Sequence, residues 1–338
     1  MVPYKTKSYV FGPADEAEYK RDYRKALFGI TRKKEGWDCM RHYEILAAGS
    51  VPMFLDIEKA PAHVMTHLPK ALLSAVRHSP YFWLKGCEMR HSQGECSFGL
   101  DHSKFSMAEY ESIACSLLEH TRQHLTTKAL ARYALAASGS LPRGQAIPSS
   151  FRALYVGGTA HNSDYLRDLM LHGFKDLLGE NLFEYNSPRC VIGYSLLTQF
   201  FFDVFTLKRL IFIRYMYHWS TDSPSNGAVA NPNKHWGMGF SVARRLPYRE
   251  DRHLKNISAA ESMILAKSFD VVIYGNAHRG MPLFSTVMKA GYSKERILVL
   301  NGEDWHGWKQ VEEQQADLKI LDKTTYFLRE LPESCPEI

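Results

Sequence analysis

The chain has 338 residues, of which 45% are hydrophobic, 12% aromatic and 23% charged. This balance is typical of a folded protein and excludes a disordered, collagen-like or coiled-coil chain as a description of the whole. The 42 Lys and Arg residues exceed the 36 Asp and Glu residues by six, a mild excess that favours an anionic ligand such as a phosphorylated small molecule without requiring nucleic acid.

The cysteines and the N-terminal segment bear on where the protein works. The six cysteines are scattered without a CxxC pair, which is typical of free cytosolic thiols rather than of a zinc site or a disulfide framework. The N-terminal segment contains no apolar stretch of the kind that a secretory signal needs. We therefore expect a cytoplasmic protein.

In chain order, the first half of the sequence alternates short apolar runs with helical patterns. The runs Ala26–Ile30 and Val51–Leu55 predict buried strands. The spacing of apolar residues predicts helices over Tyr43–Ala48, Pro61–Ala75 and Met107–Ala137. An α/β architecture is therefore expected for this half.

A linker is expected near the middle of the chain. The segment SGSLPRGQAIPSS, residues 138–150, combines two Gly, two Pro and four Ser with few large apolar residues. We place the linker over residues 139–150, between a first domain over residues 1–138 and a second domain over residues 151–338. Two domains also suit the length of the chain.

The second half contains three runs that predict buried strands, Ala153–Val156, Val271–Tyr274 and Ile297–Leu300. Continuous Val, Ile and Leu runs that alternate with helices are typical of a parallel sheet covered on both faces. Each run ends in a loop rich in Gly, Asn, Asp or His. Because ligands of such sheets bind beyond the carboxyl ends of the strands, these three loops are the expected place for chemistry.

The most apolar stretch, Tyr194–Trp219, is interrupted by charged residues such as Asp203 and Arg214. A membrane span needs about 20 mostly apolar residues, so we interpret the stretch as a buried helix or helix pair. The alternative is a surface helix in peripheral contact with a membrane, because four phenylalanines lie beside Lys208 and Arg209.

The densest cluster of candidate site residues runs from Lys33 to Pro52. It predicts a loop that enters a helix at Asp38, a suitable N-cap, and a helix that ends at Gly49. Arg41 and Glu44 share one face of this helix near its N-terminus, where the helix dipole favours an anion. The two residues can hold a diphosphate and a sugar hydroxyl, respectively, or form a surface ion pair.

These residues carry a resemblance to a known family. The segment GWDCMRHYEILAAGSVPMFLDIEKAP, followed by MTHLPKALL and LTTKALARYAL, resembles the donor-domain signature of exostosin-like glycosyltransferases of the GT-B type. In the second half, ALYVGG, HNSDYLRDLMLHGFKDLLGENLFEY, FDVVIYGNAHRG, ILVLNGEDWHG and TTYFLREL resemble the acceptor-side domain of the same group. The two domains stand in the opposite order from these relatives, as in a circular permutation.

The resemblance implies two Rossmann-like domains that face a cleft, with the donor domain over residues 1–138 and the acceptor-side domain over residues 151–338. It implies an inverting, metal-independent transfer of a sugar from a nucleotide-diphosphate donor to a hydroxyl of a glycan or glycoconjugate. The leaving nucleoside diphosphate gains negative charge in the transition state, so cations and helix N-termini that are already in place stabilise it. No cofactor is then needed.

On this resemblance, Arg41 would neutralise the diphosphate and Glu44 would hold the ribose or the donor sugar. Gly49 and Ser50 would lie close to the phosphates. The donor contacts are expected to be Lys34, Arg41, His42, Glu44, Gly49 and Ser50.

The acceptor loops supply candidates for the catalytic base. Asp304 and His306 follow the third predicted strand and could take the proton of the acceptor hydroxyl, or their loop could be a turn whose side chains serve the backbone. Asp164 is a further candidate base, or the N-cap of the helix that follows it. Acceptor contacts are expected from His278, Arg279 and Glu303, with plain surface positions as the alternative for the first two.

Other chemistries find no motif. The sequence contains no DxD triplet, no GxxxxGK[ST] loop, no GxSxG elbow and no HExxH pair, so we expect no metal site. A non-catalytic protein that binds glycans or nucleotides on the same fold is the alternative function. A nucleic-acid binder is disfavoured, because Lys and Arg are interleaved with acidic residues instead of forming a basic stripe.

Overall fold

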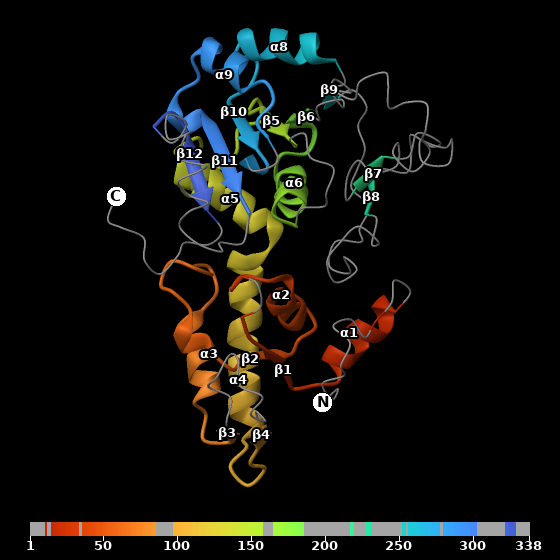
Figure 1. Cartoon of the computed structure of the whole chain (residues 1–338), viewed down its shortest axis with the longest axis vertical. Coiled ribbons are helices and arrows are strands. Elements are labelled where there is room, and N and C mark those ends of the chain that lie inside the picture. The colour runs from red at the N-terminus through yellow and green to blue at the C-terminus, as the bar shows by residue number, and fades with distance from the viewer. Residues whose placement is uncertain are drawn as a thin grey trace, which may run out of the picture. The chain divides into compact units, whose positions relative to one another are not determined.

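The computed structural model describes residues 11, 15–33, 36–85, 97–157, 165–185, 217–219, 228–230, 252–254, 256–277, 280–302 and 322–328. Two compact units divide between Thr126 and Thr127. Unit 1 comprises the described residues up to Thr126, and unit 2 comprises those from Thr127 onward. Figure 1 labels the helices and strands of both units.

Unit 1 is built around a β-α-β segment. Strands β1 (Phe28–Thr31) and β2 (Val51–Phe54) pair in parallel, and α2 (Met40–Ala47) connects them. Strands β3 (Phe82–Lys85) and β4 (Ser97–Leu100) form a separate antiparallel pair. The other elements are α1 (Glu16–Arg24), the 3-10 turn η1 (Ile57–Lys59), α3 (Lys70–Arg77), α4 (Met107–His120) and the π-helical turn η2 (Thr121–Leu125).

The core of unit 1 fixes α2 against the parallel strands. All four residues of β2 are buried, and three of them, Val51, Met53 and Phe54, share one apolar cluster with Leu46 of α2, Leu73 of α3 and Leu117 of α4. Helix α4 begins where the hydroxyl of Ser106 accepts the backbone N–H of Glu109 at 3.3 Å, a typical N-cap contact. The carboxyl edge of β1 and β2 is thus set by a packed core.

The predicted helix over residues 61–75 is wrong in its first half. Met65 adopts a positive φ of 47°, which a right-handed helix does not contain, and α3 starts only at Lys70. The ammonium group of Lys70 donates to carbonyl oxygens of the preceding loop at 3.0, 2.9 and 2.9 Å, those of Pro61, Ala62 and Val64. The Lys70 side chain therefore satisfies three carbonyl oxygens of this loop, which in a helix would accept backbone N–H groups.

Unit 2 is a doubly wound α/β domain. Six described strands form one parallel sheet in the order β12-β11-β10-β5-β6-β9. Numbered along the described chain, this order runs 3-2-1-4-5-6 from β9 to β12, the Rossmann arrangement. The strands are β5 (Ala153–Val156), β6 (Leu182–Tyr185), β9 (His253–Leu254), β10 (Val271–Tyr274), β11 (Ile297–Asn301) and β12 (Thr325–Leu328).

Helices cover both faces of this sheet. Helices α5 and α6 share an apolar cluster with Tyr155 and Ile273 on one face, and α8 and α9 share another with Val156 and Tyr274 on the other face (Figure 1). The further elements of unit 2 are α5 (Thr127–Ser138), α6 (Tyr165–Leu178), α8 (Ile257–Leu265), α9 (Phe284–Ala290), the 3-10 turns η3 (Gly179–Asn181) and η9 (Lys294–Arg296), and the antiparallel pair β7 (Tyr217–Trp219) and β8 (Ala228–Ala230).

The strands predicted for the second half are confirmed. β5 and β10 have the expected bounds, and β11 extends one residue further, to Asn301. All three belong to a parallel sheet with helices on both faces, so the expected α/β class is confirmed for unit 2. In unit 1, the parallel sheet among the described residues consists of two strands, β1 and β2.

The border between the units precedes α5, whereas the linker predicted from composition follows α5, over residues 139–150. Helix α5 packs closely on α6: a Cβ atom added at Gly173 of α6 would lie 2.1 Å from the carbonyl oxygen of Thr127. Leu141, within the expected linker, belongs to the core of unit 2. A segment rich in small residues can be a linker or part of a closely packed domain, and composition alone does not distinguish the two.

Candidate functional site

In unit 1, the first turn of α2 lies at the carboxyl edge of β1 and β2. In a β-α-β segment, the carboxyl ends of both strands and the N-terminus of the connecting helix meet at one edge, where the helix dipole favours an anion. The backbone N–H of Lys33, which follows β1, donates to Oδ1 of Asp56, which follows β2, at 3.3 Å. This hydrogen bond joins the two strand ends.

Arg41 is half-buried in the first turn of α2. Within the part of the chain that the structure describes, no group accepts a hydrogen bond from its guanidinium, and the alternative ion pair with Glu44 is not formed. Its charge nevertheless acts on its neighbours: burial raises the pKa of Cys39 and of Tyr23, and Arg41 opposes the rise in both. Arg41 is therefore a cation that an anionic ligand can use.

Glu44 is held by helix α1. The hydroxyl of Tyr19 donates to Oε2 of Glu44, and burial together with that carboxylate raises the pKa of Tyr19, which stays protonated. The rings of Tyr19 and Tyr23 meet edge to face, with centroids 5.1 Å apart. Tyr19 was not among the predicted site residues, although two tyrosines spaced i, i+4 on a helix indicate a common face.

His42 is fully buried and holds the loop that precedes α2. Its Nε2 lies 2.8 Å from the carbonyl oxygen of Trp37, and its Nδ1 lies 3.0 Å from the hydroxyl of Thr31. Because a carbonyl oxygen only accepts, Nε2 carries the hydrogen and Nδ1 accepts. Cys39 Sγ lies 3.3 Å from Nε2 and 3.8 Å from Nδ1 of the same ring. The structure therefore gives His42 a supporting role in place of the expected donor contact.

The burial of His42 predicts a pH-dependent stability. Burial lowers the pKa of His42 below its ordinary 6.5, so the unfolded chain takes up a proton at pH values where the folded protein does not. We expect the free energy of unfolding to fall as the pH drops below about 6.5, by up to about 1.4 kcal/mol per pH unit for this group, until the folded-state pKa is reached.

Urea unfolding at pH 7.5, 6.5 and 5.5 measures this dependence. His42→Gln should flatten the fall without abolishing it, because burial also lowers the pKa of His67. The exposed His102 provides the matched control, His102→Gln. Equal pH dependence in the wild type and in His42→Gln would contradict the assignment.

Gly49 and Ser50 have structural roles at the other end of α2. The helix has eight residues, so its last turn lies about 12 Å from its first, too far for these residues and Arg41 to contact the same phosphate. The hydroxyl of Ser50 lies 2.5 and 2.7 Å from the carbonyl oxygens of Tyr23 and Ala26, at the end of α1. The expectation that Gly49 and Ser50 contact the phosphates bound by Arg41 is not supported by this geometry.

Gly49 ends α2 through its backbone conformation. Its φ is 85°, and an added Cβ atom would meet no atom within 4 Å. Gly49→Ala is therefore expected to cost about 1 kcal/mol, from the left-handed backbone alone, as a lowered urea midpoint. Gly49→Asn should cost less, because Asn tolerates this conformation better; equal stability of Gly49→Ala and the wild type would refute the argument.

The remaining predicted site residues lie outside the described part of the chain. The strands β5, β10 and β11, which lead into the predicted acceptor loops, are neighbours in the sheet. Their carboxyl ends therefore lie side by side at one edge of unit 2. The residues outside the description are Lys34, Asp164, His278, Arg279, Glu303, Asp304 and His306.

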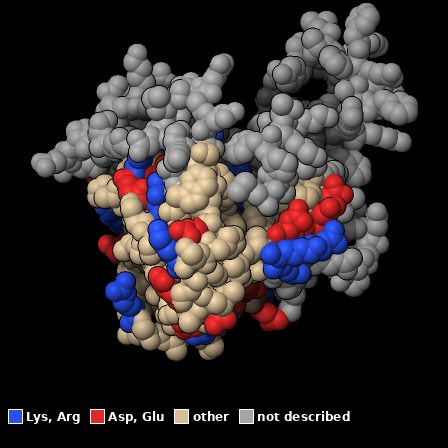
Figure 2. Space-filling view, turned by 90° about the horizontal axis from the view of Figure 1, so that it is seen from below, with Lys and Arg blue, Asp and Glu red and all other residues tan. Residues whose placement is uncertain are grey.

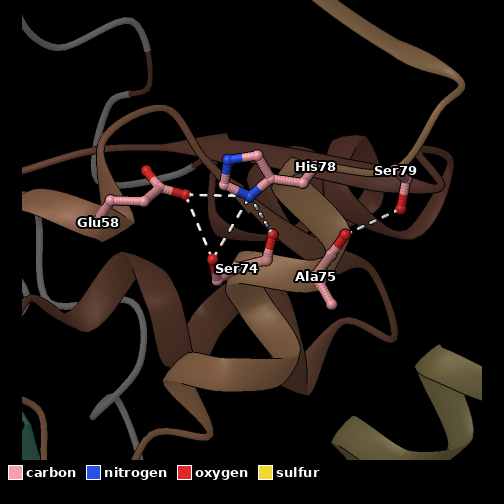
Figure 3. A network of polar contacts seen from close by, with 5 residues as sticks. All are labelled: Glu58, Ser74, Ala75, His78 and Ser79. Carbon is pink, nitrogen blue, oxygen red and sulfur yellow. Dashed lines mark hydrogen bonds and ion pairs between the residues drawn. The ribbon is translucent and has the colours of Figure 1, made fainter.

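A cluster of Glu58, Ser74 and His78 has the residue types of a hydrolase relay but not its geometry (Figure 3). Glu58 Oε1 and Ser74 Oγ lie 3.4 and 3.5 Å from the same ring nitrogen, Nδ1 of His78, and the Ser74 carbonyl oxygen lies 2.9 Å from it. A relay needs the serine and the acid at opposite ring nitrogens. This cluster therefore closes the end of α3. Across the described residues, no group of three His, Cys, Asp or Glu could hold a metal ion.

Acidic and basic side chains are interspersed on the face shown in Figure 2. Exposed ion pairs in unit 1 place opposite charges together, with Lys104 3.3 Å from Asp101 and Arg122 2.6 Å from Glu119. On this face, charges of opposite sign therefore lie beside one another.

Comparisons with protein-family models, with curated proteins and with solved structures found no match to this chain. In the part of the chain that the structure describes, no helix is both long enough and apolar enough to cross a membrane. The function proposed next therefore rests on the residues and geometry of this chain and on the resemblance of its motifs.

Proposed function

We propose that the protein is a glycosyltransferase that moves a sugar from a nucleotide-diphosphate donor to a hydroxyl of a glycan or glycoconjugate. The observation that carries the proposal is Arg41, which stands in the first turn of α2, at the carboxyl edge of β1 and β2, without a partner among the described residues. A leaving diphosphate gains charge as its bond to the sugar breaks, so a cation and a helix N-terminus at this edge favour the reaction.

Glu44 supports the same assignment from one turn further along α2. Its carboxylate is oriented by the hydroxyl of Tyr19, and a carboxylate is a strong acceptor for the hydroxyls of a ribose or a sugar. A nucleotide-sugar donor carries its diphosphate next to the hydroxyls of the ribose and the sugar, so a cation and a carboxylate one turn apart suit it. Arg41 and the helix N-terminus would supply the charge that a metal ion supplies elsewhere, and no cofactor is proposed.

Unit 2 would hold the acceptor in a GT-B arrangement of two Rossmann-like domains. Its parallel sheet brings the start of each predicted acceptor loop to one edge. We propose Asp304 or His306 as the base for the acceptor hydroxyl, with Asp164 as the alternative, and His278, Arg279 and Glu303 as acceptor contacts. The reaction would take place in the cytoplasm, in keeping with the scattered cysteines.

The first experiment is a thermal-shift and calorimetric screen of the full chain against UDP, GDP and their common sugar conjugates. A ligand that binds the folded state at 100 times its Kd stabilises it by about 2.7 kcal/mol. We expect one nucleoside diphosphate to raise the Tm and the Arg41→Ala variant to lose that response. If every nucleotide left the Tm unchanged, the proposal would fail; if the donor bound but no sugar were transferred, a non-catalytic binder would be indicated.

A further inference from the structure

Tyr274, the last residue of β10, carries a buried hydroxyl that lacks a partner. Its side chain is 0% exposed, and within the described part of the chain its hydroxyl makes no hydrogen bond. The ring is held edge to face by Phe284 of α9, with centroids 5.8 Å apart. Because an unpaired buried hydroxyl costs about 1–3 kcal/mol and is rare in folded proteins, this group calls for a partner from outside the described chain.

The position of Tyr274 is where doubly wound sheets bind ligands. Tyr274 stands in register with Val156 of β5, which stands in register with Tyr185 of β6, so the three form one row at the carboxyl ends of neighbouring strands. The helix after β5 packs on one face of the sheet, and the helix after β10 packs on the other. The connections diverge between these two strands, which defines the topological switch point at which such sheets bind ligands.

This edge of unit 2 is held firmly. An added Cβ atom at Gly275 would lie 2.3 Å from the hydroxyl oxygen of Tyr155, and that hydroxyl donates to the carbonyl oxygen of Arg167 at 2.5 Å. The end of β10, the interior of β5 and the first turn of α6 are thus packed together.

The backbone at this edge is already engaged. The N–H of Gly157 donates to the carbonyl oxygen of Tyr185 at 3.0 Å, and the N–H of Gly275 donates to that of Val156 at 2.9 Å. Phosphate sites after strands use free backbone N–H groups of this kind. These two N–H groups are therefore not free to bind a ligand.

Two uncharged polar side chains lie at the ends of β10 and β11. Asn276, two residues after Tyr274, and Asn301, the last residue of β11, are buried amides with 1% and 3% exposure, and the Asn301 amide already donates to the hydroxyl of Tyr326 at 2.9 Å. Burial raises the pKa of Tyr274, which stays protonated. Hydroxyls and amides both donate and accept, which matches the hydroxyls of a sugar, whereas a phosphate favours an unpaired cation.

We propose that unit 2 binds a neutral sugar at the carboxyl ends of β5 and β10, with the hydroxyl of Tyr274 as a hydrogen-bonding contact. The sugar reaches this hydroxyl by displacing the side chains that cover it. The assignment of this sugar as the end of the glycan acceptor rests on the proposed function; the existence of the site does not.

The test is Tyr274→Phe in the full chain, because a ligand contact and a structural contact predict opposite signs. Removing a hydroxyl that lacks a partner should leave the Tm of the unliganded protein equal or higher. The same change should weaken sugar binding roughly three- to tenfold, the value of one hydrogen bond. The probes are the methyl glycosides of glucose, galactose, mannose and N-acetylglucosamine, followed by saturation-transfer NMR and calorimetry.

The matched control is Tyr292→Phe. Tyr292 lies in the same apolar cluster as Tyr274, and its hydroxyl donates to the carbonyl oxygen of Ile264 at 3.4 Å. This variant should lose a little stability and keep its sugar affinity. A lower Tm in Tyr274→Phe, with unchanged sugar binding, would show that the hydroxyl has a structural partner and would overturn the proposal.

Three further outcomes overturn the proposed site: no methyl glycoside binds, one binds equally to the wild type and Tyr274→Phe, or uridine is the ligand that Tyr274→Phe loses. Diphosphate binding lost in Arg41→Ala tests the proposed function separately. If UDP and GDP do not bind but a methyl glycoside binds through Tyr274, the site in unit 2 stands and the proposed function fails. If a diphosphate binds and no methyl glycoside does, the proposed function stands and the site in unit 2 fails.

Discussion

Arg41→Ala is expected to weaken the binding of a nucleoside diphosphate by roughly 10- to 100-fold, because a hydrogen bond to a charged group contributes about 1.5–3 kcal/mol. The side chain is half-buried in the first turn of α2 and has no partner among the described residues. Its removal therefore leaves no orphaned carboxylate in the described part of the fold. The loss should appear in affinity, measured by calorimetry, with little change in Tm without ligand.

Two controls separate charge from position. Arg41→Lys keeps the charge but loses the planar pair of donors that fits a phosphate, so its affinity should fall between those of the wild type and Arg41→Ala. Arg122→Ala removes an equal charge from an exposed ion pair with Glu119 and should leave affinity unchanged at 0.15 M salt, where distant surface charges are screened. If Arg41→Ala and Arg122→Ala lost the same affinity, Arg41 would act only through the net charge of the protein and not through direct contact with the diphosphate.

The elements that the sequence predicted well are those whose limits are local. The strands β5, β10 and β11 consist of four or five consecutive buried residues and end at loop-forming residues, so composition alone delimits them. β6 was missed because Glu184 interrupts its apolar run. That carboxylate is buried in an ion pair with Lys175 of α6, a contact that only the tertiary structure supplies.

The helices show the same limit. The helical pattern over residues 107–137 predicts one helix, whereas the structure has α4, the π-helical turn η2 and then α5, which belongs to the other unit. At Thr126 the backbone is extended, with ψ at 151°, and the helix cannot continue through it. Apolar periodicity persists across this break because both helices bury a face, each in a different core.

The candidate site was predictable where it depends on position along α2. The place of Arg41 in the first turn follows from the start of the helix near Asp38 and from its end at Gly49. Tyr19, 25 residues before Glu44, was not predictable, because its contact depends on how α1 packs. The burial of His42 was not predictable either. Histidine is a common ligand contact, and the sequence does not show that its ring packs inside the fold.

Gly173→Ala is expected to have the largest effect on stability, a loss of about 3 kcal/mol. On an isolated helix this change would gain up to about 1 kcal/mol, since Ala favours helix more than Gly does. Here the added Cβ atom would lie 2.1 Å from the carbonyl oxygen of Thr127, more than 1 Å closer than ordinary contact. The obstacle is backbone, so the two helices must separate, and the core around Phe174 and Leu135 opens with them.

At about 2–4 °C per kcal/mol for a domain of this size, the Tm of unit 2 should fall by roughly 6–12 °C in calorimetry of the full chain. The matched control is Gly144→Ala: its φ is 79°, but its added Cβ atom meets no atom within 4 Å. The control should cost only about 1 kcal/mol, from the backbone conformation alone. If Gly173→Ala were as stable as Gly144→Ala or more so, α5 would not pack on α6 this closely, and the border between the units would no longer be placed before α5.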